Sequence, residues 1–103
     1  MGSATDFVIK NGVLTEYTGT DNRVTIPDGV TAIGNAAFLG NTSLLSVTIP
    51  ASVTAIGNRA FSECENLAEI NIPESVLMIE PSAFCCCMHL AHAKYNNIPF
   101  ASI

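Results

Sequence analysis

The apolar positions of the chain recur with a period of 23 residues. The unit V-T-I-P-x-x-V-T-A-I-G-N-x-A-F begins at Val24 and again at Val47, and a looser copy begins at Ile70. The first two copies are identical at 13 of 23 positions, and the second and third at 10. A fixed period in this range is typical of a solenoid, in which each coil buries its apolar residues against its neighbours. The sequence therefore predicts three stacked coils, over residues 24–46, 47–69 and 70–92.

Each unit opens with alternating apolar and polar residues, which is the pattern of a short strand. Stacked about 4.8 Å apart, these strands should form one narrow parallel sheet with Val and Ile facing inward. A proline ends each strand, where its missing N–H costs no ladder bond. The fold class is therefore a repeat solenoid that is mainly β, with short helical or 3-10 turns.

Two further features of the unit predict how the rest of each coil is built. Gly34 and Gly57 suit a turn that needs a positive φ. The Ala-Phe pairs at 37–38, 60–61 and 83–84 should fill the wide end of each coil with a ladder of stacked Phe rings.

Both ends of an open solenoid need covering, because they expose strand edges and core. Residues 6–23 are predicted to form an N-terminal hairpin cap, with a turn at Lys10-Asn11-Gly12 between strands at 7–9 and 13–14. Residues 93–103 are predicted to form a short C-terminal cap in which Ile98, Phe100 and Ile103 fold over the last coil. Residues 1–5 are expected to be an engineered leader or disordered, and no secretory signal precedes the domain.

Composition and charge narrow the classes of function. The 103 residues allow one domain, and 49% are apolar without a run long enough to span a membrane. The net charge is -5, and the four basic residues are scattered along the chain, at Lys10, Arg23, Arg59 and Lys94. Nucleic-acid binding needs clustered Lys and Arg, so it is not expected.

The repeat also carries a recognisable consensus. The pattern L-x-x-[IV]-x-I-P-x-x-V-x-x-I-x-x-x-A-F-x-x-C-x-x-L is filled from Leu44 to Leu67 and again from Leu67 to Leu90. It resembles the BspA-like leucine-rich repeats of bacterial surface proteins and some protist ones, and the lead-in at 6–19 resembles that family's N-terminal cap. The resemblance implies secretion or display on the cell surface, and adhesion to host extracellular proteins such as fibronectin or fibrinogen.

The strand pattern also predicts which side chains face outward. If Val and Ile face the core, the polar members project from one sheet face, which leucine-rich repeats commonly use for binding. The alternative is that they are ordinary solvated strand positions. The candidate protein-binding residues are Arg23, Thr25, Ser46, Thr48, Glu69, Asn71, His92 and Lys94.

The third unit departs from the first two at its middle. Thr31-Ala32 and Thr54-Ala55 become Leu77-Met78, so two small or polar positions become large and apolar. Either the C-terminal cap folds over Leu77 and Met78, or they form an exposed apolar patch for a partner or a second copy. The change to Glu80-Pro81 predicts a different turn geometry there.

The densest cluster of reactive side chains runs from Cys85 to His92. Cys87 aligns with Cys64, a buried position, and the two could lie within disulfide range, although free thiols are favoured. Outward ligands for zinc could come from Cys85, Cys86, His89 and His92, but the spacing is wrong for a zinc finger or ribbon. No metal or other cofactor is therefore predicted. Exposed Cys85 and Cys86 could oxidise or cross-link molecules.

Three functions are compatible with these features, and none of them is enzymatic. The leading hypothesis is a protein-interaction module that binds a host extracellular matrix or plasma protein through the sheet face. The second is a structural unit that dimerises through the third repeat and the C-terminal cap. The third is a small acidic intracellular inhibitor. No catalytic residues are predicted, because there is no G-x-S-x-G motif and no carboxylate near a Ser-His pair.

Overall fold

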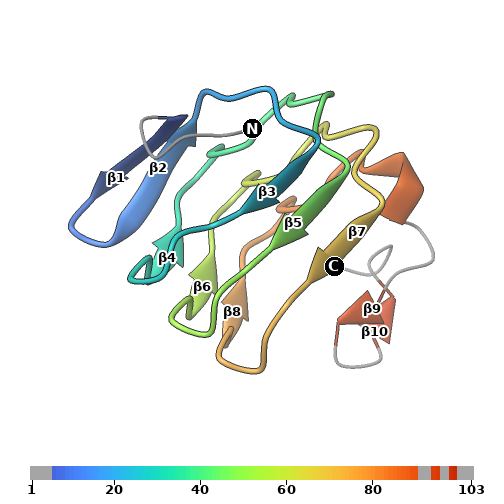
Figure 1. The fold of residues 1–103 in the computed structure, drawn as a ribbon. Helices are drawn as coiled ribbons and strands as arrows, with labels where there is room; N and C mark the ends of the chain where they lie inside the picture. Colours follow the sequence, from blue (N-terminus) through green and yellow to red (C-terminus); the bar gives the residue numbers. More distant parts are fainter. Residues whose placement is uncertain (1–5, 91–93, 96–97, 100–103) are drawn as a thin grey trace.

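The chain winds into stacked coils that carry a three-stranded parallel sheet and a five-stranded mixed sheet (Figure 1). This computed structural model describes residues 6–90, 94–95 and 98–99. Within these ranges no helix has the length and apolar character that a membrane crossing requires. The elements are β1 (Phe7–Lys10), β2 (Val13–Tyr17), β3 (Arg23–Thr25), β4 (Ala32–Ile33), β5 (Ser46–Thr48), β6 (Ala55–Ile56), β7 (Glu69–Asn71), β8 (Met78–Ile79), the 3-10 helix η2 (Met88–Leu90), β9 (Lys94–Tyr95) and β10 (Ile98–Pro99).

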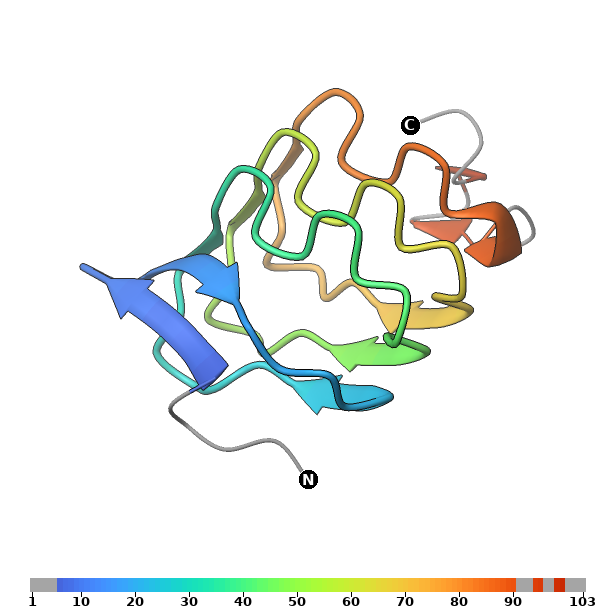
Figure 2. The same cartoon turned by 90° about the horizontal axis from the view of Figure 1, so that it is seen from above.

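The predicted narrow parallel sheet is the three-stranded sheet β3-β5-β7. Its strands pair one repeat apart, so that Val24, Val47 and Ile70 lie in one row. A second sheet, of order β1-β2-β4-β6-β8, was not predicted. Figure 2 shows the coils from above, with β3, β5 and β7 side by side along one side of the stack.

The predicted N-terminal hairpin is confirmed. β1 and β2 pair antiparallel, and the Asn11-Gly12 turn has φ values of 53° and 82°, as a tight hairpin turn requires. β2 then pairs in parallel with β4, with Leu14 opposite Ile33. The hairpin therefore caps the stack by adding two strands to β4, β6 and β8, which makes the sheet five-stranded.

Over the described residues, no strand extends the three-stranded sheet beyond β7. β9 pairs antiparallel with β10 in a separate two-stranded sheet. Lys94 was expected to project from the same sheet face as the residues of β3, β5 and β7; its strand instead pairs with β10 and belongs to the separate sheet. Residues 1–5, His92, Phe100 and Ile103 lie outside the described residues.

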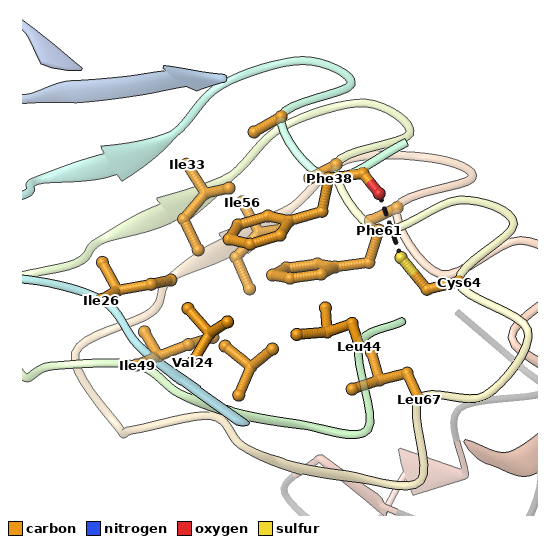
Figure 3. Close-up of a cluster of buried hydrophobic side chains, with 14 of the residues drawn as sticks. Val24, Ile26, Ile33, Phe38, Leu44, Ile49, Ile56, Phe61, Cys64 and Leu67 are labelled. Carbon is orange, nitrogen blue, oxygen red and sulfur yellow. Dashed lines mark hydrogen bonds between the residues drawn. The ribbon is translucent and has the colours of Figure 1, made fainter. Parts of the chain in front are cut away.

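The predicted aromatic ladder is confirmed and is longer than expected. Phe38 and Phe61 stack with ring centroids 4.8 Å apart (Figure 3). Phe61 and Phe84 stack with ring centroids 5.3 Å apart. Tyr17 adds a rung 5.1 Å from Phe38, and Phe7 packs 5.0 Å from Tyr17. The ladder thus joins the N-terminal cap to all three coils in one core.

The prediction that Gly34 and Gly57 adopt positive φ is wrong, since their backbones lie outside the left-handed region. They are needed because neighbouring coils approach closely at these points. A Cβ on Gly34 would lie 2.9 Å from the carbonyl oxygen of Leu14, and one on Gly57 would lie 2.8 Å from the backbone nitrogen of Asn35.

The left-handed positions lie elsewhere in the coil and repeat with it. One set is Ala36, Arg59 and Ser82, with φ of 59°, 60° and 64°; the other is Gly40, Glu63 and Cys86, with φ of 72°, 61° and 66°. Residues with a Cβ are disfavoured in this conformation by roughly 1–2 kcal/mol. These positions are therefore strained in every coil, except where glycine stands.

The turn at Glu80-Pro81 keeps the geometry of the other coils, so the prediction of a different turn is wrong. Ala83 N donates to Glu80 O at 3.2 Å, as Ala60 N does to Gly57 O at 3.2 Å. Pro81 is tolerated because the equivalent N–H, that of Asn58, donates only to a side chain, Asn35 Oδ1, at 2.8 Å. Pro81 has no N–H to donate, and Asn58 Nδ2 instead donates to Pro81 O at 2.6 Å.

Replacing Tyr17 by Phe should stabilise the protein. The Tyr17 hydroxyl oxygen is buried over Gly19 and makes no hydrogen bond. Burial raises the pKa of Tyr17, and the nearby backbone of Asp21 offsets part of that shift. An unsatisfied buried hydroxyl costs about 1–3 kcal/mol, so Tyr17→Phe should raise the free energy of unfolding by about 1 kcal/mol in urea denaturation. The reciprocal change Phe38→Tyr should lower it, and a Tyr17→Phe variant less stable than wild type would contradict the prediction.

Glu63→Gly should also stabilise the protein, because glycine adopts the left-handed conformation without a steric penalty. The greater freedom of glycine in the unfolded chain offsets part of the gain, which leaves an expected increase of about 0.5–1 kcal/mol in the free energy of unfolding. Glu63→Ala is the matched control, because it removes the same carboxylate but keeps the Cβ. Equal stabilities of the two variants would show that the backbone at Glu63 is not strained.

Candidate protein-interaction surface

The outer face of the three-stranded sheet presents two rows of polar side chains. Arg23, Ser46 and Glu69 lie in register across β3, β5 and β7, as do Thr25, Thr48 and Asn71. The residues between them point into the core, with Val24 4% and Val47 2% exposed. Of the eight predicted binding residues, six therefore share one face, on which Ser46 is half-buried and the others are exposed. We call these six residues the sheet face.

The charges of the sheet face lie at its opposite edges. Arg23 is on the first strand and Glu69 on the last, with Ser46 between them. Strands are spaced about 4.8 Å apart, so the two charged residues are separated by roughly 10 Å along the row. A complementary partner would present an acidic group near β3 and a basic group near β7.

Asn71 is engaged in holding the last two coils together. Its Oδ1 accepts a hydrogen bond from Ile49 N at 2.9 Å, and its Nδ2 donates to Ile49 O at 3.2 Å. In the preceding pair of coils the equivalent amide, Ile26 N, donates directly to the backbone at Thr48 O. The Asn71 side chain thus replaces a backbone partner, and Arg23, Thr25, Ser46, Thr48 and Glu69 remain as side chains without that structural task.

Two open depressions border the sheet face. One, of about 450 Å³, is lined by residues of β5 and β7 together with Ala68. The other, of about 510 Å³, lies at the β3 edge and is lined by Phe7, Tyr17 and residues 21–25. Both are shallow enough to suit side chains of a protein partner better than an enclosed small molecule.

Leu77 and Met78 are exposed at the edge of the other sheet. Met78 is in β8, the last strand, in register with Ala55 of β6. The Leu77 side chain is 85% exposed and that of Met78 is 56% exposed. The two side chains are therefore an exposed apolar patch, and most of the predicted C-terminal cap, including Phe100 and Ile103, lies outside the described residues.

The cysteines divide into a buried pair and an exposed pair, and all four are free thiols. Cys64 Sγ donates to Phe38 O at 3.1 Å (Figure 3), and Cys87 Sγ donates to Phe61 O at 2.9 Å. The two thiols therefore have equivalent roles, each satisfying a carbonyl of the coil before it. The neighbouring Cys87 thiol and burial raise the pKa of Cys64, which keeps that thiol protonated.

The residues proposed as outward metal ligands are not brought together as a set. His89 Nδ1 hydrogen-bonds to Glu65 O at 2.7 Å, the contact that Asn66 Nδ2 makes to Thr42 O, at 2.8 Å, one coil earlier. His89 thus occupies a structural position of the repeat. Over the described ranges, no group of three or more His, Cys, Asp or Glu side chains is placed to hold a metal ion. Cys85 and Cys86 are adjacent to each other, and His92 is outside those ranges.

The structure resembles solved leucine-rich repeat proteins of bacteria. A T. pallidum leucine-rich repeat protein matches with a TM-score of 0.80 at 34% identity, over 87% of this chain and 47% of that one. A leucine rich cell surface protein of Faecalibacterium prausnitzii matches with a TM-score of 0.70 at 32% identity, over 81% and 26%. A third, from Bacteroides capillosus, matches with a TM-score of 0.59 at 30% identity, over 65% and 57%.

This chain thus spans about half or less of the first two structures and under two thirds of the third. No curated protein matches it. The model of the BspA type leucine rich repeat region matches residues 9–101, in six copies. The chain therefore belongs to the BspA-type leucine-rich repeat family, whose repeats generally mediate protein–protein interactions.

Proposed function

We propose that the protein is a non-enzymatic interaction module that binds a partner protein through its sheet face. The observation that carries the proposal is the in-register display of Arg23, Thr25, Ser46, Thr48 and Glu69 on three rigid strands. Because the strands already fix the backbone of these residues, binding needs no ordering of the backbone, which favours association.

The partner we propose is a host extracellular matrix or plasma protein, bound in the manner of an adhesin. Support comes from the F. prausnitzii relative, which is described as a cell surface protein. The sheet face is small for this task, since a stable interface uses roughly 20–30 residues on each side. Several copies on one surface, or further coils in a longer chain, would raise the avidity without new contacts.

The test is binding to immobilised fibronectin and fibrinogen, measured by surface plasmon resonance. The charge-swapped variant Arg23→Glu/Glu69→Lys should bind roughly tenfold more weakly, equivalent to about 1.4 kcal/mol, because both edge charges then oppose the partner. The matched control is Lys10→Glu/Glu16→Lys, which makes the same two charge swaps on the N-terminal hairpin and should bind like wild type. Equal losses in the two variants, or no binding by wild type, would contradict the proposal.

A second candidate function is self-assembly through the apolar patch of Leu77 and Met78. Among the described strands, β8 is the last of its sheet, and its edge lies beside two exposed apolar side chains. Two copies that brought these edges together would cover both patches, and the resulting contact would be the same on each copy. A two-fold dimer is therefore the assembly that the patch suits.

Self-assembly predicts a mass that doubles with concentration from the 10.8 kDa of one chain. Light scattering should show that Leu77→Ser/Met78→Ser remains at the mass of one chain, because the substitution removes the apolar surface that drives association. Met88→Ser is the matched control: Met88 is 71% exposed but lies in η2, so its loss should leave the dimer intact. A wild-type mass that stays at one chain at every concentration would exclude this candidate.

A further inference from the structure

Two adjacent exposed thiols stand at the start of the cysteine-rich turn of the third coil. The Sγ atoms of Cys85 and Cys86 lie 3.3 Å apart, and both residues are free and exposed. The equivalent positions of the earlier coils are Leu39-Gly40 and Ser62-Glu63, so neither thiol is required by the repeat. The pair is therefore a feature of this coil alone.

The backbone of the coil holds the two thiols on the same side. Cys86 has a φ of 66°, the left-handed conformation that every coil adopts at this position. In an extended strand, neighbouring side chains point to opposite faces, and the left-handed residue removes that alternation. Hydrogen bonds from Cys85 N to Ser82 O at 3.1 Å and from Glu63 N to Cys85 O at 2.7 Å fix the turn.

The geometry suits a shared ligand better than a disulfide. Adjacent Cα atoms are about 3.8 Å apart, whereas disulfide-bonded cysteines usually have Cα atoms about 4.4–6.8 Å apart, so a Cys85–Cys86 bridge would be strained. If two sulfur atoms are each bonded at about 2.3 Å to the same soft atom, with a right angle between the two bonds, the sulfur atoms lie about 3.3 Å apart. The observed separation of 3.3 Å between the two Sγ atoms matches this without movement of the turn.

We propose that Cys85 and Cys86 form a dithiol site that captures a thiophilic trivalent arsenic compound through two sulfur–arsenic bonds. With an organic arsenous oxide, both thiols lose their protons and the arsenic-bound oxygen leaves with them as water. Two As–S bonds replace the two As–O bonds of the oxide, and arsenic stays trivalent, so no oxidant or reductant is needed. The organic substituent supplies the third bond to arsenic, which is why two protein ligands suffice.

The other thiols are not available to this ligand. Cys64 is 0% and Cys87 is 7% exposed, and each donates to a carbonyl inside the core. The hydrogen bond with Cys85 is the main cause that raises the pKa of Cys86, which disfavours its thiolate and slows reaction with reagents that attack a single sulfur. Selectivity therefore comes from the pairing of the two sulfurs.

The test uses phenylarsine oxide and the reduced protein, followed by intact-mass spectrometry. Wild type should gain one phenylarsenic group and lose two hydrogens, keep the group through a wash with excess mercaptoethanol, and release it to dithiothreitol. Cys85→Ser and Cys86→Ser should each bind roughly a hundredfold more weakly or worse, because the second sulfur no longer binds intramolecularly. Cys64→Ser is the control and should bind like wild type, with circular dichroism as the check that it folds.

Peptide mapping of the wild-type adduct locates the bound sulfurs independently of any variant. Arsenic on the peptide that contains Cys85 and Cys86, with Cys64 and Cys87 still free to react after unfolding, would support the site. The proposal is wrong if mercaptoethanol strips the group from wild type, if either single Ser variant retains it equally well, or if it maps to Cys64 and Cys87.

Discussion

A single coil of this chain cannot bury its own apolar side chains, so the fold depends on the contact between one coil and the next. Backbone hydrogen bonds set that contact at the aromatic positions. The N–H groups of Tyr17, Phe38 and Phe61 donate to the carbonyls of Ala37, Ala60 and Ala83, at 3.0, 2.7 and 2.8 Å. Each acceptor directly precedes the next aromatic residue, so the bonds that fix the coil spacing also bring the rings into stacking distance. The register of both sheets follows from the same spacing.

The same contact explains why the chain tolerates local strain. Arg59 and Glu63 hold left-handed backbones in the middle coil, and hydrogen bonds to both neighbouring coils surround them: Ala36 N donates to Asn58 O, and Glu63 N donates to Cys85 O. A strained residue persists where its surroundings over-determine its conformation. Once one coil has a left-handed backbone at these positions, a coil stacked in register on it must adopt the same conformation at the equivalent positions, whichever residues it carries. This is why Cys86 adopts a conformation that suits glycine.

The period of the sequence was enough to predict the coils, the aromatic ladder and the inward and outward sides of β3, β5 and β7. It could not reveal β4, β6 and β8, because two paired residues are too few to show an alternating pattern. The place of Tyr17 in the aromatic ladder was not predicted, because Tyr17 precedes Phe38 by 21 residues and not by 23. The role of Asn71 was also invisible, since an amide that replaces a backbone partner looks in sequence like any polar strand residue. On the sheet face, the sequence therefore predicts which side chains point outward, but not which of them already make hydrogen bonds within the fold.

The third coil shows which positions of the repeat must be apolar for coils to stack and which can vary. Its positions that face the preceding coil are kept, with Val76, Phe84 and Leu90 buried as their equivalents are. Four of its departures, Leu77, Met78, Cys85 and Cys86, are exposed, and the backbone beneath them follows the path of the earlier coils. These departures therefore bring no gain in core packing, and large exposed apolar groups carry a cost in solubility. Neither the core nor the turn geometry accounts for them, and these are the residues for which we propose contacts outside the coil, with another copy or with a ligand.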